Sequence, residues 1–121
     1  MTEKTNSKQY DLEERTFSFA KNIRAFVKQL SKTTGNIEDS KQLVRSSGSV
    51  GANYIEANES LSKKDFIHRI KICRKEAKES RYWLSLLDIP LESSLEKERL
   101  RLIKEVVELM SIFGSIVRKS E

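Results

Sequence analysis

Cationic side chains crowd one arc of the segment from residue 63 to residue 87 when that segment is drawn as a helix of about 100 degrees per residue. The arc holds Lys63, Lys64, Lys71, Arg74, Lys75, Lys78 and Arg81. Between residues 63 and 81 eight basic and three acidic residues give a net charge of +5, which equals the formal charge of the whole chain. Such an arc can neutralise successive phosphates and release their counterions. We expect a nucleic-acid backbone to contact Lys64, Lys71, Arg74, Lys75, Lys78 and Arg81. The alternative is an ordinary solvated helix face.

The pattern of potential catalytic residues does not favour an enzyme. His68, the single histidine, lies among lysines, where a solvated or phosphate-facing position suits it better than the role of a general base. Cys73 falls on the apolar stripe of its helix, as a small core residue does. Gly48 and Gly51 lack the Lys-Ser or Lys-Thr that follows a phosphate-binding loop. We therefore expect no catalytic activity.

Polar side chains three residues apart raise the question of a metal site, and they occur as Asn53 with Glu56 and as Glu76 with Glu79. A di-iron bundle uses two Glu-x-x-His motifs, which a chain with one histidine cannot supply. We expect no metal and no cofactor. The acidic residues are instead expected to pair, across helices or subunits, with Arg45, Arg69 or Arg74.

Four amphipathic helices are predicted to position these side chains, because apolar residues recur at steps of three and four along four segments. Asp11, Ser62 and Ser93 each precede an acidic residue by three positions, which is typical of a helix start. Gly35 and Pro90 mark interruptions. The expected helices cover residues 11–30, 37–57, 62–87 and 93–117.

Short connections between these helices predict antiparallel neighbours, and so an all-α, up-down-up-down four-helix bundle. We expect one domain over residues 11–121 and a flexible tail over residues 1–10. The chain has one cysteine and no apolar run near the roughly 20 residues that span a bilayer. A soluble, cytoplasmic protein is therefore expected.

Small residues interrupt the second predicted helix in the stretch SSGSVGANYIEA, residues 46–57. Each glycine costs up to about 1 kcal/mol relative to alanine inside a helix. A cluster of them favours close approach of a neighbouring backbone, which would involve Ser47, Gly48, Gly51 and Ala52. The alternative is a helix that breaks at Gly48.

Apolar residues exceed what one buried arc requires on the last two helices. The expected core stripe of the last helix holds Leu100, Ile103, Val106, Val107, Met110, Phe113 and Val117, with Leu109 outside it. The surplus predicts a subunit interface, with Tyr82 and Trp83 as anchors that combine apolar area with a polar tip. Its expected members are Ile72, Tyr82, Trp83, Leu86, Ile112 and Ile116. Thicker packing within one subunit is the alternative.

The run from Arg45 to Leu87 resembles the four-helix bundle proteins encoded by intervening sequences in bacterial 23S ribosomal RNA genes. The resemblance is densest at Ala52, Asn53 and Glu56, and at the Tyr82-Trp83-Leu84 segment. Many members have Gly soon after that Glu, where this chain has Ala57-Asn58, so the local turn can differ.

The resemblance implies a left-handed four-helix bundle that assembles as a ring-like homopentamer. It also implies kinship with the accessory variability protein of diversity-generating retroelements, which binds reverse transcriptase and nucleic acid. Together with the basic arc, it predicts a noncatalytic homo-oligomer that binds RNA or DNA backbone, can also bind a protein partner, and does not associate with a membrane. A structural or protein-partner scaffold without nucleic-acid binding is the alternative.

Overall fold

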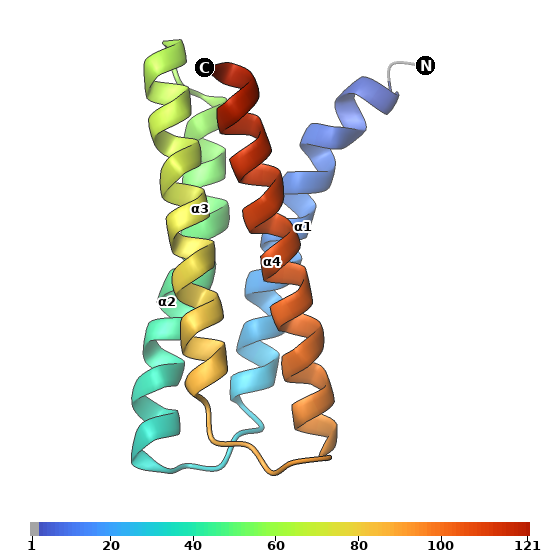
Figure 1. Cartoon of the computed structure of the whole chain (residues 1–121), viewed down its shortest axis with the longest axis vertical. Helices are drawn as coiled ribbons and strands as arrows, with labels where there is room; N and C mark the ends of the chain where they lie inside the picture. Colours follow the sequence, from blue (N-terminus) through green and yellow to red (C-terminus); the bar gives the residue numbers. More distant parts are fainter. Residues whose placement is uncertain (1–2) are drawn as a thin grey trace.

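A computed structural model describes residues 3–121, with side chains from Leu12 onward. It contains four helices, α1 (Glu3–Val27), α2 (Thr34–Asn58), α3 (Lys63–Leu86) and α4 (Ser94–Ser120). Successive helices run in opposite directions and α1 also packs against α4 (Figure 1). The all-α, up-down bundle is confirmed. Within the described helices α1 does not meet α3, nor α2 meet α4, so the α1–α2 side lies opposite the α3–α4 side.

Side-chain caps explain three of the helix starts. The hydroxyls of Ser62 and Ser93 accept hydrogen bonds from the backbone N–H groups of Asp65 and Glu96, at 3.0 and 3.1 Å. These two starts are confirmed. The start of α2 differs from the prediction, because Thr33 accepts from the Asn36 N–H and caps the helix there. Gly35 therefore lies in the first turn of α2 and does not end the helix before it.

The first and second helices are longer than predicted. The backbone of α1 is helical from Glu3, so Asp11 lies inside the helix and does not begin it. No glycine or proline precedes Asp11 to stop the helix. The flexible tail expected over residues 1–10 includes residues 1 and 2, which lie outside the described residues, and its flexibility stays a prediction. The α2 helix passes through Gly48 and Gly51 without interruption, so the alternative of a break at Gly48 is wrong.

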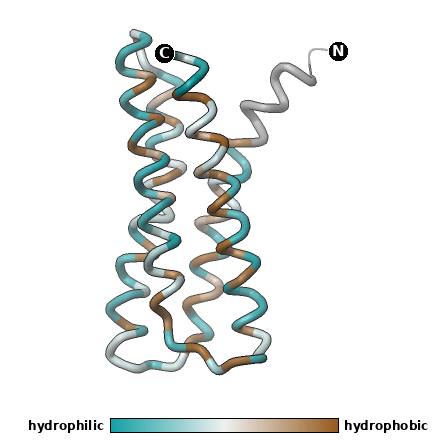
Figure 2. The backbone as a smooth tube through the Cα atoms, in the orientation of Figure 1, coloured by the Kyte–Doolittle hydropathy of each residue, from teal (hydrophilic) through white to brown (hydrophobic). Residues whose placement is uncertain are grey.

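The core runs the length of the bundle, and Figure 2 shows hydrophobic positions recurring along each helix. Its largest fully buried side chains include Phe19, Phe26 and Phe113. The stripe predicted for α4 needs correction. Leu102 and Leu109 are buried, whereas Leu100 and Val107 are 57% and 41% exposed. Because apolar residues cover two arcs of α4, periodicity alone did not select the arc that faces the other helices.

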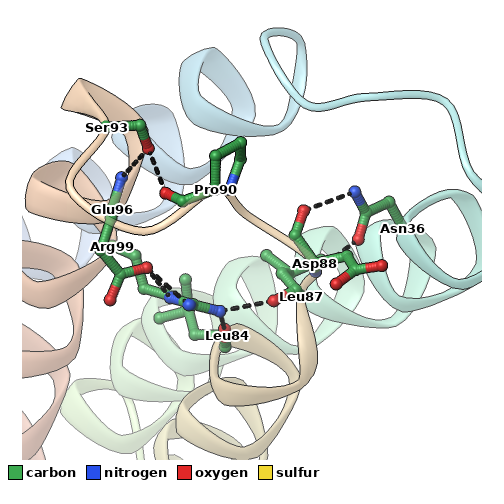
Figure 3. A network of polar contacts seen from close by, with 8 residues as sticks. All are labelled: Asn36, Leu84, Leu87, Asp88, Pro90, Ser93, Glu96 and Arg99. Atoms are coloured by element: carbon green, nitrogen blue, oxygen red, sulfur yellow. Dashed lines mark hydrogen bonds and ion pairs between the residues drawn. The ribbon is translucent and has the colours of Figure 1, made fainter.

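A hydrogen-bond network joins the two loops at one end of the bundle (Figure 3). The buried amide of Asn36 donates to the carbonyls of Ser31 and Asp88 and accepts from the Asp88 N–H at 2.8 Å. The Arg99 guanidinium donates to the carbonyls of Leu84 and Leu87 at the end of α3. Free backbone carbonyls at that helix end thereby gain partners. The network fixes the turn that sets α4 against α3.

Candidate nucleic-acid interface

A cationic groove lies between α3 and α4. Its volume is about 440 Å³, and its lining consists of Lys71, Arg74, Lys75, Lys78, Gly114, Val117 and Arg118. Since α3 and α4 are antiparallel, the last turns of α4 lie beside the first half of α3. Four of the predicted nucleic-acid contacts, Lys71, Arg74, Lys75 and Lys78, therefore face a groove whose other wall adds a fifth cation. We call this surface the basic groove.

Most of the cations in the basic groove lack an acidic partner. Among the described residues, Arg74, Lys75, Lys78 and Arg118 form no ion pair, while Lys71 lies 3.7 Å from the Glu121 carboxylate. The charges of these side chains are therefore available to an external anion.

The acidic residues of α3 face the other way. Glu76 and Glu79 have carboxylate oxygens 3.9 and 3.6 Å from the Arg45 guanidinium of α2. Pairing of these acids with Arg45 agrees with the prediction, whereas Arg69 donates to the Asn53 amide oxygen at 3.0 Å and not to an acid. Glu76 and Glu79 of α3 thus face α2, whereas Lys71, Arg74, Lys75 and Lys78 line the groove beside α4.

The cationic surface extends toward the start of α3. A second hollow of about 600 Å³ is lined by Lys63, Lys64, Ile67, His68, Lys71, Ser120 and Glu121. Lys64 and Lys71 therefore belong to one continuous strip, because Lys71 lines both hollows. Arg81 is half-buried and lines neither of them. Of the six predicted contacts, five lie on the strip.

Gly114 and Arg118 of α4 were not predicted. Added at Gly114, a Cβ atom would lie 3.3 Å from Arg118 Nη1 and 3.6 Å from Arg74 Nε. The missing side chain leaves space in which two guanidinium groups converge. Gly114 and Arg118 are four residues apart, so they lie one helical turn from each other on the same face of α4. This spacing, together with the predicted antiparallel packing of α4 on α3, was the only sequence pattern that could have indicated the second wall of the groove.

The opposite side of the bundle carries an apolar groove between α1 and α2, with a volume of about 670 Å³. Its exposed flanks include Phe17 and Ile55, which are 65% and 52% exposed. Gly48, Gly51 and Ala52 lie along it. Neither Phe17 nor Ile55 was predicted to belong to a binding surface, although both lie off the core arcs of their helices.

The four residues predicted to allow close helix packing occupy different environments. At Gly51 an added Cβ would lie 3.0 Å from the Thr16 hydroxyl and 3.7 Å from the Thr16 carbonyl carbon. At Gly48 the nearest atom would be Arg24 Nη2 at 3.8 Å. Ser47 is buried and Ala52 is exposed. Of the two glycines, only Gly51 has the α1 backbone within reach of an added Cβ atom.

The residues predicted to form a subunit interface divide into two groups. Tyr82 and Leu86 are 58% and 48% exposed. The second group is half-buried and consists of Ile72, Trp83, Ile112 and Ile116. Of these four residues, Trp83, Ile112 and Ile116 pack against the core. Tyr82 and Trp83 meet edge to face with ring centroids 5.1 Å apart. Within the described structure the buried Trp83 indole N–H has no hydrogen-bond partner.

The groups considered for catalysis lie apart. Cys73 is fully buried, and burial raises the pKa of its thiol to about 12, so the reactive thiolate is disfavoured. His68 is exposed on the cationic strip. From Leu12 to Glu121, no three side chains of His, Cys, Asp and Glu gather as metal ligands would. No described helix is long and apolar enough to cross a membrane.

These features define an up-down four-helix bundle with a basic groove on one side and an apolar groove on the other. Residues 8–114 match the family of 23S rRNA-intervening sequence proteins, and the chain belongs to that family. It is similar to a protein of unknown function from the S23 ribosomal protein family of Bacteroides thetaiotaomicron, whose crystal structure matches with a TM-score of 0.79 and 32% sequence identity. That match covers 92% of this chain and 98% of the other. No curated protein matches the chain.

Proposed function

We propose that this protein is a noncatalytic homo-oligomer that binds the backbone of RNA or DNA along the basic groove. The observation that carries this proposal is the convergence of Arg74, Lys75, Lys78 and Arg118 on one groove without ion-pair partners among the described residues. Unpaired cations on one surface attract a polyanion and displace its condensed counterions.

The lining of the groove favours contact with phosphates over reading of bases. Neither the groove nor its extension toward Lys63 is lined by Phe, Tyr or Trp. Single-strand binders that stack bases use such aromatic platforms. The expected binding is therefore independent of sequence and dominated by charge.

We further propose that the oligomer is the ring-like homopentamer that the family resemblance implies. Each subunit of a ring presents two different surfaces to its neighbours. The apolar groove with Phe17 and Ile55 is one apolar surface, and the exposed Tyr82 and Leu86 of α3 form another. Neither includes the cations of the basic groove, so assembly would leave them free and repeat them around the ring.

The salt dependence of binding tests the nucleic-acid proposal. Fluorescence anisotropy with a labelled oligonucleotide, repeated over a range of salt concentrations, gives the slope of log affinity against log salt. Four unpaired cations predict a slope of roughly −3 to −4 for each groove engaged. Affinity that does not change with salt, or no binding at low salt, would refute the proposal. The scaffold without nucleic-acid binding would then be the better account.

Light scattering tests the oligomer. We expect a mass five times the 14.0 kDa of one chain. Replacing Tyr82 and Leu86 by serine should lower the mass with little loss of helicity, because both side chains are exposed within one subunit. Trp83→Ala is less suitable, since Trp83 also packs against the core. A wild-type mass of one chain at high concentration would contradict this part of the proposal.

A further inference from the structure

The floor of the basic groove differs from the rest of the strip, because two guanidinium groups meet over a glycine. The Arg74 and Arg118 side chains come from different helices, and both lie close to Gly114. An atom at the Cβ position of Gly114 would be 3.6 Å from Arg74 Nε and 3.3 Å from Arg118 Nη1. The distance between Arg74 Nε and Arg118 Nη1 therefore cannot exceed the sum of these two distances.

Two like charges at such a separation repel each other unless an anion lies between them. In the described part of the chain neither arginine has an acidic partner. Gly114 is buried inside α4, where glycine costs about 1 kcal/mol relative to alanine. Helix propensity therefore does not explain a glycine at position 114. The absence of a side chain there does leave room for the Arg74 and Arg118 guanidinium groups.

We infer that Arg74 and Arg118 form a clamp over Gly114 for a single phosphomonoester, such as the terminal phosphate of a nucleic-acid strand. Guanidinium groups are suited to phosphate because they donate paired hydrogen bonds in a fixed planar geometry. Two positive charges match the charge of about −1.5 to −2 on a phosphomonoester better than the single charge of an internal diester. The neighbouring Lys71, Lys75 and Lys78 would contact the phosphates that follow along the strand.

This inference rests on the proposed function, and it adds that the groove binds the end of a strand more tightly than its interior. The test compares two oligonucleotides of one sequence, with a 5′-phosphate and with a 5′-hydroxyl. Wild-type protein should bind the phosphorylated oligonucleotide about tenfold more tightly, as additional charge-assisted hydrogen bonds predict. Equal affinities would overturn the clamp and leave backbone binding intact.

Three variants separate the clamp from general charge. Gly114→Leu fills the space without changing the net charge and should abolish the preference for the phosphorylated end, while salt-dependent binding through Lys71, Lys75 and Lys78 persists. Gly114→Ala should reduce the preference and, because alanine favours the helix, remain folded. Lys78→Gln, the control, should weaken binding of both oligonucleotides and keep the preference. A preference that persists in both Gly114 variants would overturn the clamp.

Inorganic phosphate supplies a readout that does not need nucleic-acid binding. Titration followed by NMR of the arginine Nε–H groups should show saturable shifts at Arg74 and Arg118 in the wild type, and these should be lost in Gly114→Leu. No shift at either arginine would overturn the clamp. If neither oligonucleotide binds while phosphate shifts both arginines, the proposed function fails and the phosphate clamp stands.

Discussion

Gly48 and Gly51 lie one turn apart on α2, yet alanine should have opposite effects on stability at the two positions. At Gly51 the new methyl group would lie 3.0 Å from Thr16 Oγ1 and 3.3 Å from Thr16 Cβ. Thr16 is 2% exposed, and its hydroxyl donates to the Leu12 carbonyl at 2.8 Å. Because Thr is branched at Cβ and its hydroxyl is bonded, the side chain cannot rotate away cheaply.

The expected magnitudes follow from these contacts. Overpacking costs about 1–3 kcal/mol, and the gain in helix propensity from Gly to Ala returns up to about 1 kcal/mol. Gly51→Ala should therefore lower the free energy of unfolding by up to about 2 kcal/mol. At Gly48 the nearest atom is the flexible end of Arg24 at 3.8 Å, so only the propensity gain applies. Gly48→Ala should raise the free energy of unfolding by roughly 0.5–1 kcal/mol.

Urea unfolding at one fixed protein concentration measures both variants, since the stability of an oligomer depends on concentration. The double variant Thr16→Ala/Gly51→Ala supplies the control. Removing the Thr16 hydroxyl and methyl should make the second substitution less harmful than it is alone, which gives a coupling energy in the cycle. Equal and stabilising effects at the two glycines would refute the assignment of close α1–α2 packing to Gly51.

Two further predictions concern the Asn36 amide and the Cys73 thiol. Asn36→Ala removes two hydrogen bonds to Asp88 of the other loop and one to Ser31 of the loop before α2, and should cost about 2 kcal/mol in urea unfolding; an unchanged midpoint would contradict this role. Burial raises the pKa of Cys73 to about 12 from 9.0, so the folded state keeps its proton longer than the unfolded state. Its contribution to stability should be complete below pH 9 and be lost as the pH rises toward 12, and native protein at pH 8 should resist a thiol reagent that labels it fully in urea. Rapid labelling of native protein would contradict the burial of Cys73.

Local signals in the sequence accounted for much of the fold. Ser62 and Ser93 predicted two helix starts because a cap acts within one turn of its own helix. The start of α2 was missed, since Thr33, Thr34 and Asn36 all can cap and Gly35 is usual at a helix end. The role of Asn36 could not be foreseen, because its partner Asp88 belongs to a different loop.

The basic groove was predicted on one wall only. Periodicity placed Lys71, Arg74, Lys75 and Lys78 on one arc of α3, but periodicity does not say which residues of another helix lie opposite. That depends on the turn between α3 and α4, which Arg99 helps to hold. Arg118 and Gly114 were therefore missed because the face of α4 that packs against α3 was not predicted correctly. For the same reason Val107 was expected in the core, whereas Leu109 is the buried residue.

Charge-matched variants test the basic groove most directly. Lys75→Gln/Lys78→Gln removes two cations from the groove, and Lys28→Gln/Lys32→Gln removes two exposed cations from the region where α1 ends. The two double variants have the same net charge, so their non-specific attraction to the oligonucleotide should fall equally. The groove variant should lose affinity for an oligonucleotide, and its salt slope should shrink by about 2 for a double strand. The control should keep a slope near that of the wild type. Equal losses of affinity and slope in the two variants would contradict binding at the basic groove.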